Sequence, residues 1–252
     1  VHPIHTEAVD VAFNRSEILA TLFVTLALVA LLRWSAERPL LAYASASLLY
    51  FFALLSRESG VTLPVLAALV LLGGRPESER GLHPSRFLVP LLALLAPLAL
   101  YLWMSSSVFG PSVSVMDSVI RGVGYQSFPQ RLAIVATTFR DYWRMMVWPW
   151  PLRATCEDYV VGGVAGAVVL HAALLAVAVA LRRRFPGVLL GVTFFYVALL
   201  PSSKLMAYPA WLAERFTYLP SVGFVIVVAS LAHLLERRVG RLLGIGNLTR
   251  RD

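Results

Sequence analysis

The stretch VHPIHTEAVDVAFNRSEILATLF, residues 1–23, places charged and imidazole side chains directly before a long apolar run. These side chains are His2, His5, Glu7, Asp10, Arg15 and Glu17. Ionisable groups at the mouth of a membrane helix are costly to bury, so they usually face a water-filled cavity or a functional site. Two later stretches, SRES at 56–59 and ERFTY at 214–218, repeat the arrangement. We therefore expect all three stretches to meet at one membrane face.

The composition is that of a membrane protein. The chain is 58% hydrophobic and only 14% charged, with a mean hydropathy of +0.74, whereas soluble domains carry about 25% charged residues. The net charge of +8 lies mostly at the ends of apolar runs, where it orients a membrane protein, so nucleic acid is not an expected partner. Cys156, the single cysteine, cannot form an internal disulfide. The sequence predicts an all-α, polytopic helical membrane protein.

The apolar runs predict about seven transmembrane helices in one membrane domain, residues 1–252. The expected spans are 16–34, 40–55, 61–72, 87–104, 160–181, 188–200 and 216–235. The third span would rise only about 18 Å as a helix, against a hydrocarbon core of about 30 Å. Either flanking polar residues extend it, or the turn at Arg57 and Glu58 lies below the membrane surface and lines a water-filled pocket.

Residues 105–159 form the longest polar region and are expected to be an outer-face loop. Within it, residues 131–148 predict an amphipathic helix lying in the membrane interface. Its predicted apolar face comprises Leu132, Val135, Ala136, Phe139, Trp143 and Met146, and its polar face Thr137, Arg140, Asp141 and Arg144. Trp148 and Trp150, at its end, suit the headgroup layer.

The basic residues predict the orientation. Most of them lie in 33–38, 75–86, 182–184 and 236–252, and such segments stay in the cytoplasm. The tail 236–252 is then a cytoplasmic basic tail, and residue 1 lies outside. Lys204 is the single lysine among many arginines, which favours a bacterial source. We expect an integral protein of the bacterial inner membrane with its polar site facing the periplasm, or of the ER membrane facing the lumen in a eukaryote.

Basic side chains at the outer boundary, next to acidic ones, suit a lipid-linked phosphate. The guanidinium fork of Arg15, Arg57 or Arg215 matches phosphate oxygens, and Lys204 supplies a point charge. A nearby carboxylate or imidazole would act as a general base on an acceptor hydroxyl or would orient an arginine.

Structural roles for the same residues stay open. Arg57 and Glu58 also fit an ion pair inside the bundle. Glu214 and Arg215 fit a helix-start pair with Tyr218 as an interfacial anchor, and Lys204 fits snorkelling to the headgroups. His2 and His5 fit ordinary histidines at a loop–helix junction. Their His-x-x-His spacing also leaves a divalent metal open, although no third ligand is evident; no metal or other cofactor is expected.

Six ordered blocks resemble the membrane domain of the transmembrane and tetratricopeptide-repeat proteins. Those proteins are protein O-mannosyltransferase-like members of the GT-C glycosyltransferase superfamily. The blocks are HPIHTEAV (2–9), NRSEIL (14–19), SRESGVTLP (56–64), WPWPL (148–152), LLPSS (199–203) and AERFTYLPSVG (213–223). The resemblance covers nearly the whole chain and implies part of a GT-C-type fold.

The resemblance implies a glycosyltransferase that takes a sugar, mannose in that family, from a polyprenyl or dolichyl phosphate carrier. It delivers the sugar to a hydroxyl, for example on a protein acceptor, at the periplasmic or lumenal face. Membrane lipids, the carrier and the acceptor are thus the expected partners. The residues implied as supporting groups are His2, Glu7, Glu58 and Glu214, and those implied to bind the lipid phosphate are Arg15, Arg57, Lys204, Arg215 and Tyr218.

The sequence departs from the family pattern in three respects. The family usually has lysine where this chain has Arg57, so the positive charge is kept. It usually has asparagine where this chain has Lys204, so this chain carries an additional positive charge there. Family members also have upstream spans, with an acidic outer loop thought to supply the catalytic base, and a repeat domain downstream. We therefore expect residues 1–252 to be an N-terminally truncated fragment that is inactive alone, with its main catalytic base upstream of Val1.

Two other function classes remain open. A transporter of a lipid-linked substrate would also place charges in a cavity, but it should show paired halves with broken helices, and no such duplication is visible. A non-catalytic membrane scaffold would use the same charges only to hold the bundle together.

Overall fold

The computed structural model describes residues 2–73, 85–109, 127–150, 155–156, 161–203, 205 and 212–242, and it is mostly helical. Its elements in chain order are η1 (Pro3–His5), α1 (Thr6–Asp10), η2 (Ala12–Asn14), α2 (Arg15–Trp34), α3 (Pro39–Ser56), η3 (Glu58–Thr62), α4 (Leu63–Gly73), α5 (Ser85–Phe109), α7 (Phe128–Val147), β1 (Thr155–Cys156), α8 (Val164–Leu181), α9 (Pro186–Leu199), β2 (Leu212–Ala213), η5 (Glu214–Thr217) and α10 (Tyr218–Leu242). The two short strands pair antiparallel.

Among the residues that the structure describes, five helices are long and apolar enough to cross a membrane. They are Arg15–Trp34, Pro39–Ser56, Leu88–Val108, Val164–Leu181 and Glu214–Glu236. Two further apolar helices, Glu58–Gly73 and Pro186–Leu199, are shorter. The predicted class, a helical integral membrane protein, is confirmed, whereas the count of seven crossings stays a prediction.

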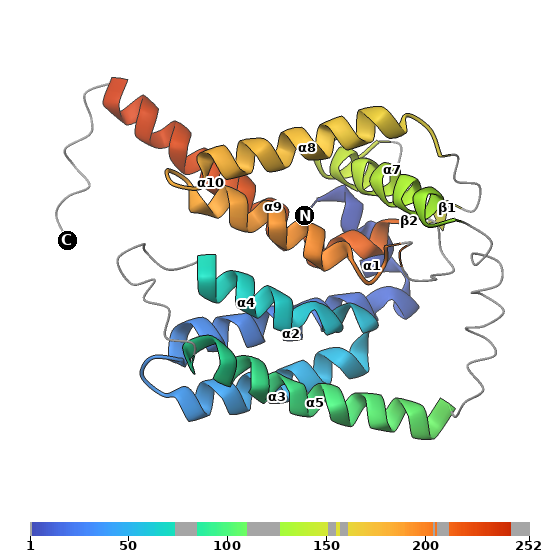
Figure 1. Cartoon of the computed structure of the whole chain (residues 1–252), viewed down its shortest axis with the longest axis vertical. Helices are drawn as coiled ribbons and strands as arrows, with labels where there is room; N and C mark the ends of the chain where they lie inside the picture. Colours follow the sequence, from blue (N-terminus) through green and yellow to red (C-terminus); the bar gives the residue numbers. More distant parts are fainter. Residues whose placement is uncertain are drawn as a thin grey trace.

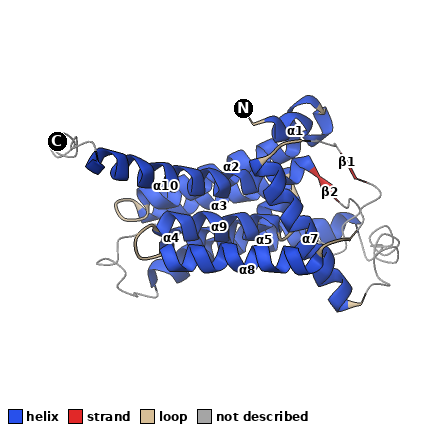
Figure 2. Cartoon of the chain, turned by 90° about the horizontal axis from the view of Figure 1, so that it is seen from above, coloured by secondary structure: helices blue, strands red, loops and turns tan. Residues whose placement is uncertain are grey.

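The long helices lie alongside one another, and the connecting segments gather at the two ends of the bundle (Figure 1). The short elements η1, α1, η5 and the β1–β2 pair lie at one end, and the C-terminal end of α10 lies at the other (Figures 1 and 2). Two helices that start at the α10-tail end, α3 and α9, begin with a proline, whose fixed φ and missing N–H suit the first helical position.

The break between α3 and η3 folds the chain back on itself. Arg57 is extended, with φ −161° and ψ 149°, and it ends α3. Three residues later, a Cβ on Gly60 would lie 2.9 Å from the carbonyl carbon of Ala53, so only glycine allows this approach of η3 to α3. The break therefore holds Arg57, Glu58 and Ser59 beside the start of α2.

Two hydrophobic clusters fill the bundle. One joins α2, α3 and α4 to α9 around Tyr50 and Phe194, and the other joins α7 and η5 to α9 around Phe195. Helices α9 and α10 cross at two glycines, where a Cβ on Gly191 would lie 2.5 Å from the carbonyl oxygen of Gly223. Small residues at such crossings let membrane helices approach closely.

Two predictions about residues 105–159 are wrong in detail. Helix α5 continues to Phe109, so residues 105–109 are helical and not part of a loop. In α7, Thr137 is fully buried although it was assigned to the polar face. The Thr137 hydroxyl donates to the carbonyl oxygens of Ala133 and Ile134 at 3.0 Å. A hydroxyl satisfied by its own helix can be buried at little cost, which a polar–apolar pattern does not register.

Phe139 and Trp143 of α7 pack in the same cluster as α9, with the Trp143 and Phe195 ring centroids 4.1 Å apart. A histidine on α8 makes polar contacts with both α7 and α9. His171 Nε2 lies 2.9 Å from the carbonyl oxygen of Ala136 on α7, and its Nδ1 lies 2.7 Å from the Tyr196 hydroxyl on α9. The position of α7 in the membrane interface stays a prediction.

Candidate functional site

The N-terminal segment meets the segment before α10 in a buried ion pair between Glu7 and Arg215. Glu7 lies in α1 and Arg215 in η5, and the guanidinium Nη1 of Arg215 contacts Glu7 Oε1. Asn14 Nδ2 donates to the same oxygen at 3.1 Å, and the backbone N–H of Arg215 donates to Glu7 Oε2 at 3.0 Å. The Glu7 side chain is only 3% exposed. Three donors therefore satisfy this carboxylate away from water.

A second buried ion pair joins the start of α2 to the break after α3. Arg57 Nε lies 3.1 Å from Glu17 Oε1, and the two side chains are 10% and 4% exposed. Arg57 Nη1 donates to the Ser16 hydroxyl at 3.2 Å, and the Ser59 hydroxyl donates to Glu17 Oε2 at 2.9 Å. This pair lies at the same end of the bundle as the first.

The two pairs have the same energetic character. Removing a charge from water costs several kcal/mol, and a buried pair recovers that cost only when further hydrogen bonds satisfy its remaining donors and acceptors. Glu7 and Glu17 each accept such bonds from a neighbour besides their arginine. A carboxylate thus holds each guanidinium group, through a charge-assisted hydrogen bond in the Arg215–Glu7 pair and an ion pair in the Arg57–Glu17 pair.

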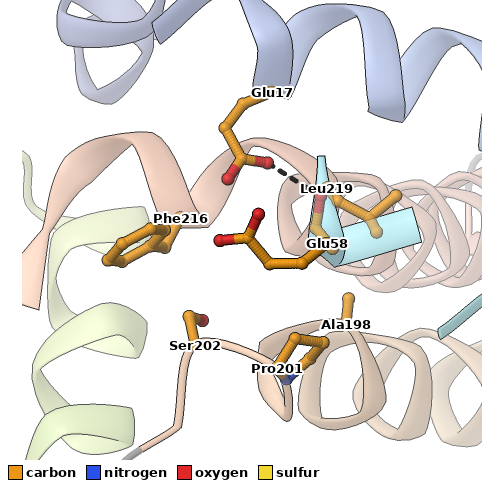
Figure 3. Close-up of a pocket in the computed structure, with 8 residues that line it drawn as sticks. Glu17, Glu58, Ala198, Pro201, Ser202, Phe216 and Leu219 are labelled. Atoms are coloured by element: carbon orange, nitrogen blue, oxygen red, sulfur yellow. Dashed lines mark hydrogen bonds between the residues drawn. The ribbon is translucent and has the colours of Figure 1, made fainter. Parts of the chain in front are cut away.

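A small open pocket of about 10 Å³ lies beside the second pair, which is room for about one water molecule. Its lining includes Glu17, Glu58, Ser59, Ser202 and Phe216. The carboxylates of Glu17 and Glu58 turn toward the same space, with Ser202 across from them (Figure 3). Glu58 is 52% exposed and its Oε1 lies 3.6 Å from Arg57 Nε. Glu58 is thus a predicted site residue that faces an opening.

Two further predicted site residues, His2 and Tyr218, both lie next to the ring of His5. His2 Nδ1 accepts from the backbone N–H of Ile4 at 3.4 Å and caps η1. The His5 ring meets the Tyr218 ring edge-on, with centroids 4.6 Å apart, and lies 6.3 Å from the His2 ring. Among the residues that the structure describes, no group of three metal-ligating side chains occurs, so the His-x-x-His spacing gains no third ligand there.

The three remaining predicted site residues are Glu214, Arg15 and Lys204. Glu214 is 4% exposed and begins η5 directly before Arg215. Arg15 is exposed, and its Nε donates to the carbonyl oxygen of Val9 at 3.4 Å, so it does not join either buried pair in the described structure. Lys204 lies outside the described residues.

The structure adds Glu17, Asn14 and Ser59 to the site. Glu17 stands in the stretch singled out from the sequence but was not assigned a role. Its signal was an acidic residue in the first turn of an apolar helix, where it must be paired or exposed. Asn14 and Ser59 carry no such signal, because short polar residues next to a helix start usually serve as caps.

The stability of this end should depend on pH through His5. Burial lowers the pKa of His5 below its ordinary value, and the nearby His2 lowers it further. The unfolded chain therefore binds a proton at His5 more readily than the folded chain does. The contribution of neutral His5 to the free energy of unfolding is complete above about pH 6.5 and is lost as the pH falls below that value. We expect the melting temperature of the wild type to fall more between pH 7.5 and 5.5 than that of H5F, which keeps a ring against Tyr218. Equal falls in both proteins would contradict the assignment.

The site thus offers two fixed guanidinium groups, a partly exposed carboxylate and hydroxyls at one end of the bundle. Comparison with protein-family models, with curated proteins and with solved structures found no match. The chemistry of these side chains is accordingly the basis for the function proposed below, together with the resemblance of the motifs.

Proposed function

We propose that this chain is the membrane part of a GT-C-type glycosyltransferase. It would transfer a sugar, mannose by the resemblance, from a polyprenyl or dolichyl phosphate carrier to a hydroxyl of a protein or other acceptor. The observation that carries the proposal is the pair of buried carboxylate–arginine contacts, Glu7–Arg215 and Glu17–Arg57, at the end of the bundle where Glu58 lines a pocket.

The reaction breaks the bond between the anomeric carbon and a phosphate oxygen and forms a bond from that carbon to the acceptor oxygen. The acceptor proton passes to a base, and negative charge develops on the carrier phosphate. Arg57 and Arg215 are suited to that charge because a preorganised guanidinium stabilises it without reorganising. Glu7 and Glu17 act as positioning residues that fix those guanidinium groups.

Glu58 is the acidic side chain best placed to accept a hydrogen bond from a hydroxyl of the sugar or of the acceptor, because half of it is exposed. His2, Glu214 and Tyr218 line the same end and have supporting roles. In the family that the motifs resemble, an acidic outer loop is thought to supply the main base, so no main base is assigned among residues 1–252. No metal is assigned to the reaction.

The site is proposed to face the periplasm, or the ER lumen in a eukaryote. Arg33 lies in the last turn of α2, and the turns after α2 and α8 contain Arg38 and residues 182–184. Both turns lie at the opposite end of the bundle (Figure 1). Lysine and arginine in short loops keep an end in the cytoplasm, so the end with the carboxylate–arginine pairs is the outer one.

The proposal is tested by transfer from a polyprenyl phosphate mannose in proteoliposomes that contain the full-length gene product. We expect R57M to lower kcat by about 100- to 1000-fold, which is the usual cost of losing one preorganised donor at a developing charge. The matched control R38M removes an exposed arginine from the opposite end and should transfer at the wild-type rate. Equal rates for R57M and the wild type would refute the phosphate-binding role.

A membrane scaffold without catalysis is the second candidate. The observation that favours it is the depth of the pairing, since Arg57 and Arg215 are only 10% and 15% exposed and both contact a carboxylate. If the protein is a scaffold, R57M should lower the melting temperature. Any loss of sugar transfer should then be no larger than the loss of folded protein.

A further inference from the structure

A groove lies at the end of the bundle opposite the carboxylate–arginine pairs. It is formed where the C-terminal end of α4 approaches α9 and the α8–α9 turn, and its volume is about 470 Å³. Figure 1 shows the end of α4 and this turn at the same end of the bundle. The groove is larger than the pocket beside Glu58 and reaches the size at which proteins hold small ligands.

The two parts of the groove wall differ in chemistry. The helical part is apolar and includes Leu69, Leu72, Leu189 and Leu190. Thr193 adds little polarity there, because its hydroxyl donates to the carbonyl oxygen of Leu189 at 2.7 Å.

The turn supplies the polar part of the wall, through Arg182 and Arg183, both of which are exposed. Within the described part of the chain, no ion pair involves either arginine. Arg182 and Arg183 therefore differ from Arg57 and Arg215, because no carboxylate of the described residues neutralises them.

An apolar wall that ends at two cations is complementary to a molecule with an apolar chain and an anionic head. Basic pockets between membrane helices bind lipids with anionic headgroups in this way. We propose that this groove binds one glycerophospholipid with a net negative phosphate headgroup, whose acyl chain lies along α4 and α9 and whose phosphate contacts Arg182 and Arg183. The proposal does not depend on the sugar transfer proposed above.

The test is native mass spectrometry of the full chain in detergent, titrated with dioleoylphosphatidylglycerol or dioleoylphosphatidylcholine. The wild type should bind the anionic lipid about 30-fold more tightly, from the contribution of two basic side chains. R182Q/R183Q should lose this preference. The matched control R33Q/R38Q removes two arginines near the same end, on the α2 side, and should keep it.

A second variant tests the apolar wall without changing charge. A Cβ on Gly73 would lie 3.4 Å from the Leu190 Cδ1, so G73F places a ring against the groove wall. We expect G73F to weaken binding of the anionic lipid at least tenfold, with the folded state checked by thermal unfolding. Unchanged lipid preference in R182Q/R183Q would overturn the proposal. So would glycerol 3-phosphate, which has no acyl chain, competing as well as the intact lipid does.

Discussion

Replacing Arg215 by methionine should lower the free energy of unfolding by about 3–5 kcal/mol, because the change leaves the buried carboxylate of Glu7 without its cation. Glu7 is 3% exposed and keeps only the N–H groups of Asn14 and of residue 215 as donors. These are dipoles, and they do not replace a full charge. The pair also connects α1 to η5, which pack against each other there, so its loss weakens that contact.

The measurement is the unfolding transition of R215M in detergent, compared with that of R15M. Arg15 lies close to the same end but is exposed and makes only a 3.4 Å contact with the carbonyl oxygen of Val9, so R15M should change stability little. If R215M and R15M unfold alike, the Glu7–Arg215 contact does not hold this end of the bundle together.

Replacing Gly191 by leucine should have the second large effect. A Cβ at this position would lie 2.5 Å from the carbonyl oxygen of Gly223 and 2.9 Å from the backbone N of Val227. These are backbone atoms of α10, so the clash can be relieved only by moving one helix from the other. Overpacking a well-packed contact costs about 1–3 kcal/mol and sometimes more, and we expect G191L to lie at or above the top of that range.

Gly166 on α8 provides the control for the glycine prediction. A Cβ on Gly166 would meet nothing within 4 Å, so G166L should be tolerated, with a small gain from the better helix propensity of leucine. The melting temperature in detergent distinguishes the two variants. A G191L protein as stable as G166L would mean that α9 and α10 do not pack at these glycines.

The class of the fold could be predicted from hydropathy because a membrane helix must satisfy its own backbone and be apolar over its length. That rule locates α2, α3 and α8 to within a few residues. It also locates the shorter α4 and α9 to within two residues, but it does not predict that α5 continues through SSSVF to Phe109. Serines can continue a helix when their hydroxyls bond the preceding turn, as those of Ser106 and Ser107 do.

The convergence of the three polar stretches could also be predicted, because ionisable groups next to apolar helices gather where water or partners are present. The pairing could not. Glu58 is adjacent to Arg57 in the sequence, yet the closer carboxylate is that of Glu17, on another helix. Likewise Arg215 pairs with Glu7 and not with Glu214 next to it. Partners that are distant in sequence are set by helix packing, which a single sequence does not specify.

The most direct test of the proposed site separates the scaffold role of an ion pair from its chemical role. In the double variant E17M/R57M both charges are replaced by apolar side chains of similar size, and such replacements of buried pairs are often neutral or stabilising. Transfer from polyprenyl phosphate mannose by the full-length protein in proteoliposomes is then measured beside its melting temperature. We expect a melting temperature close to that of the wild type with transfer lowered at least 100-fold. Wild-type transfer in this stable double variant would contradict the account.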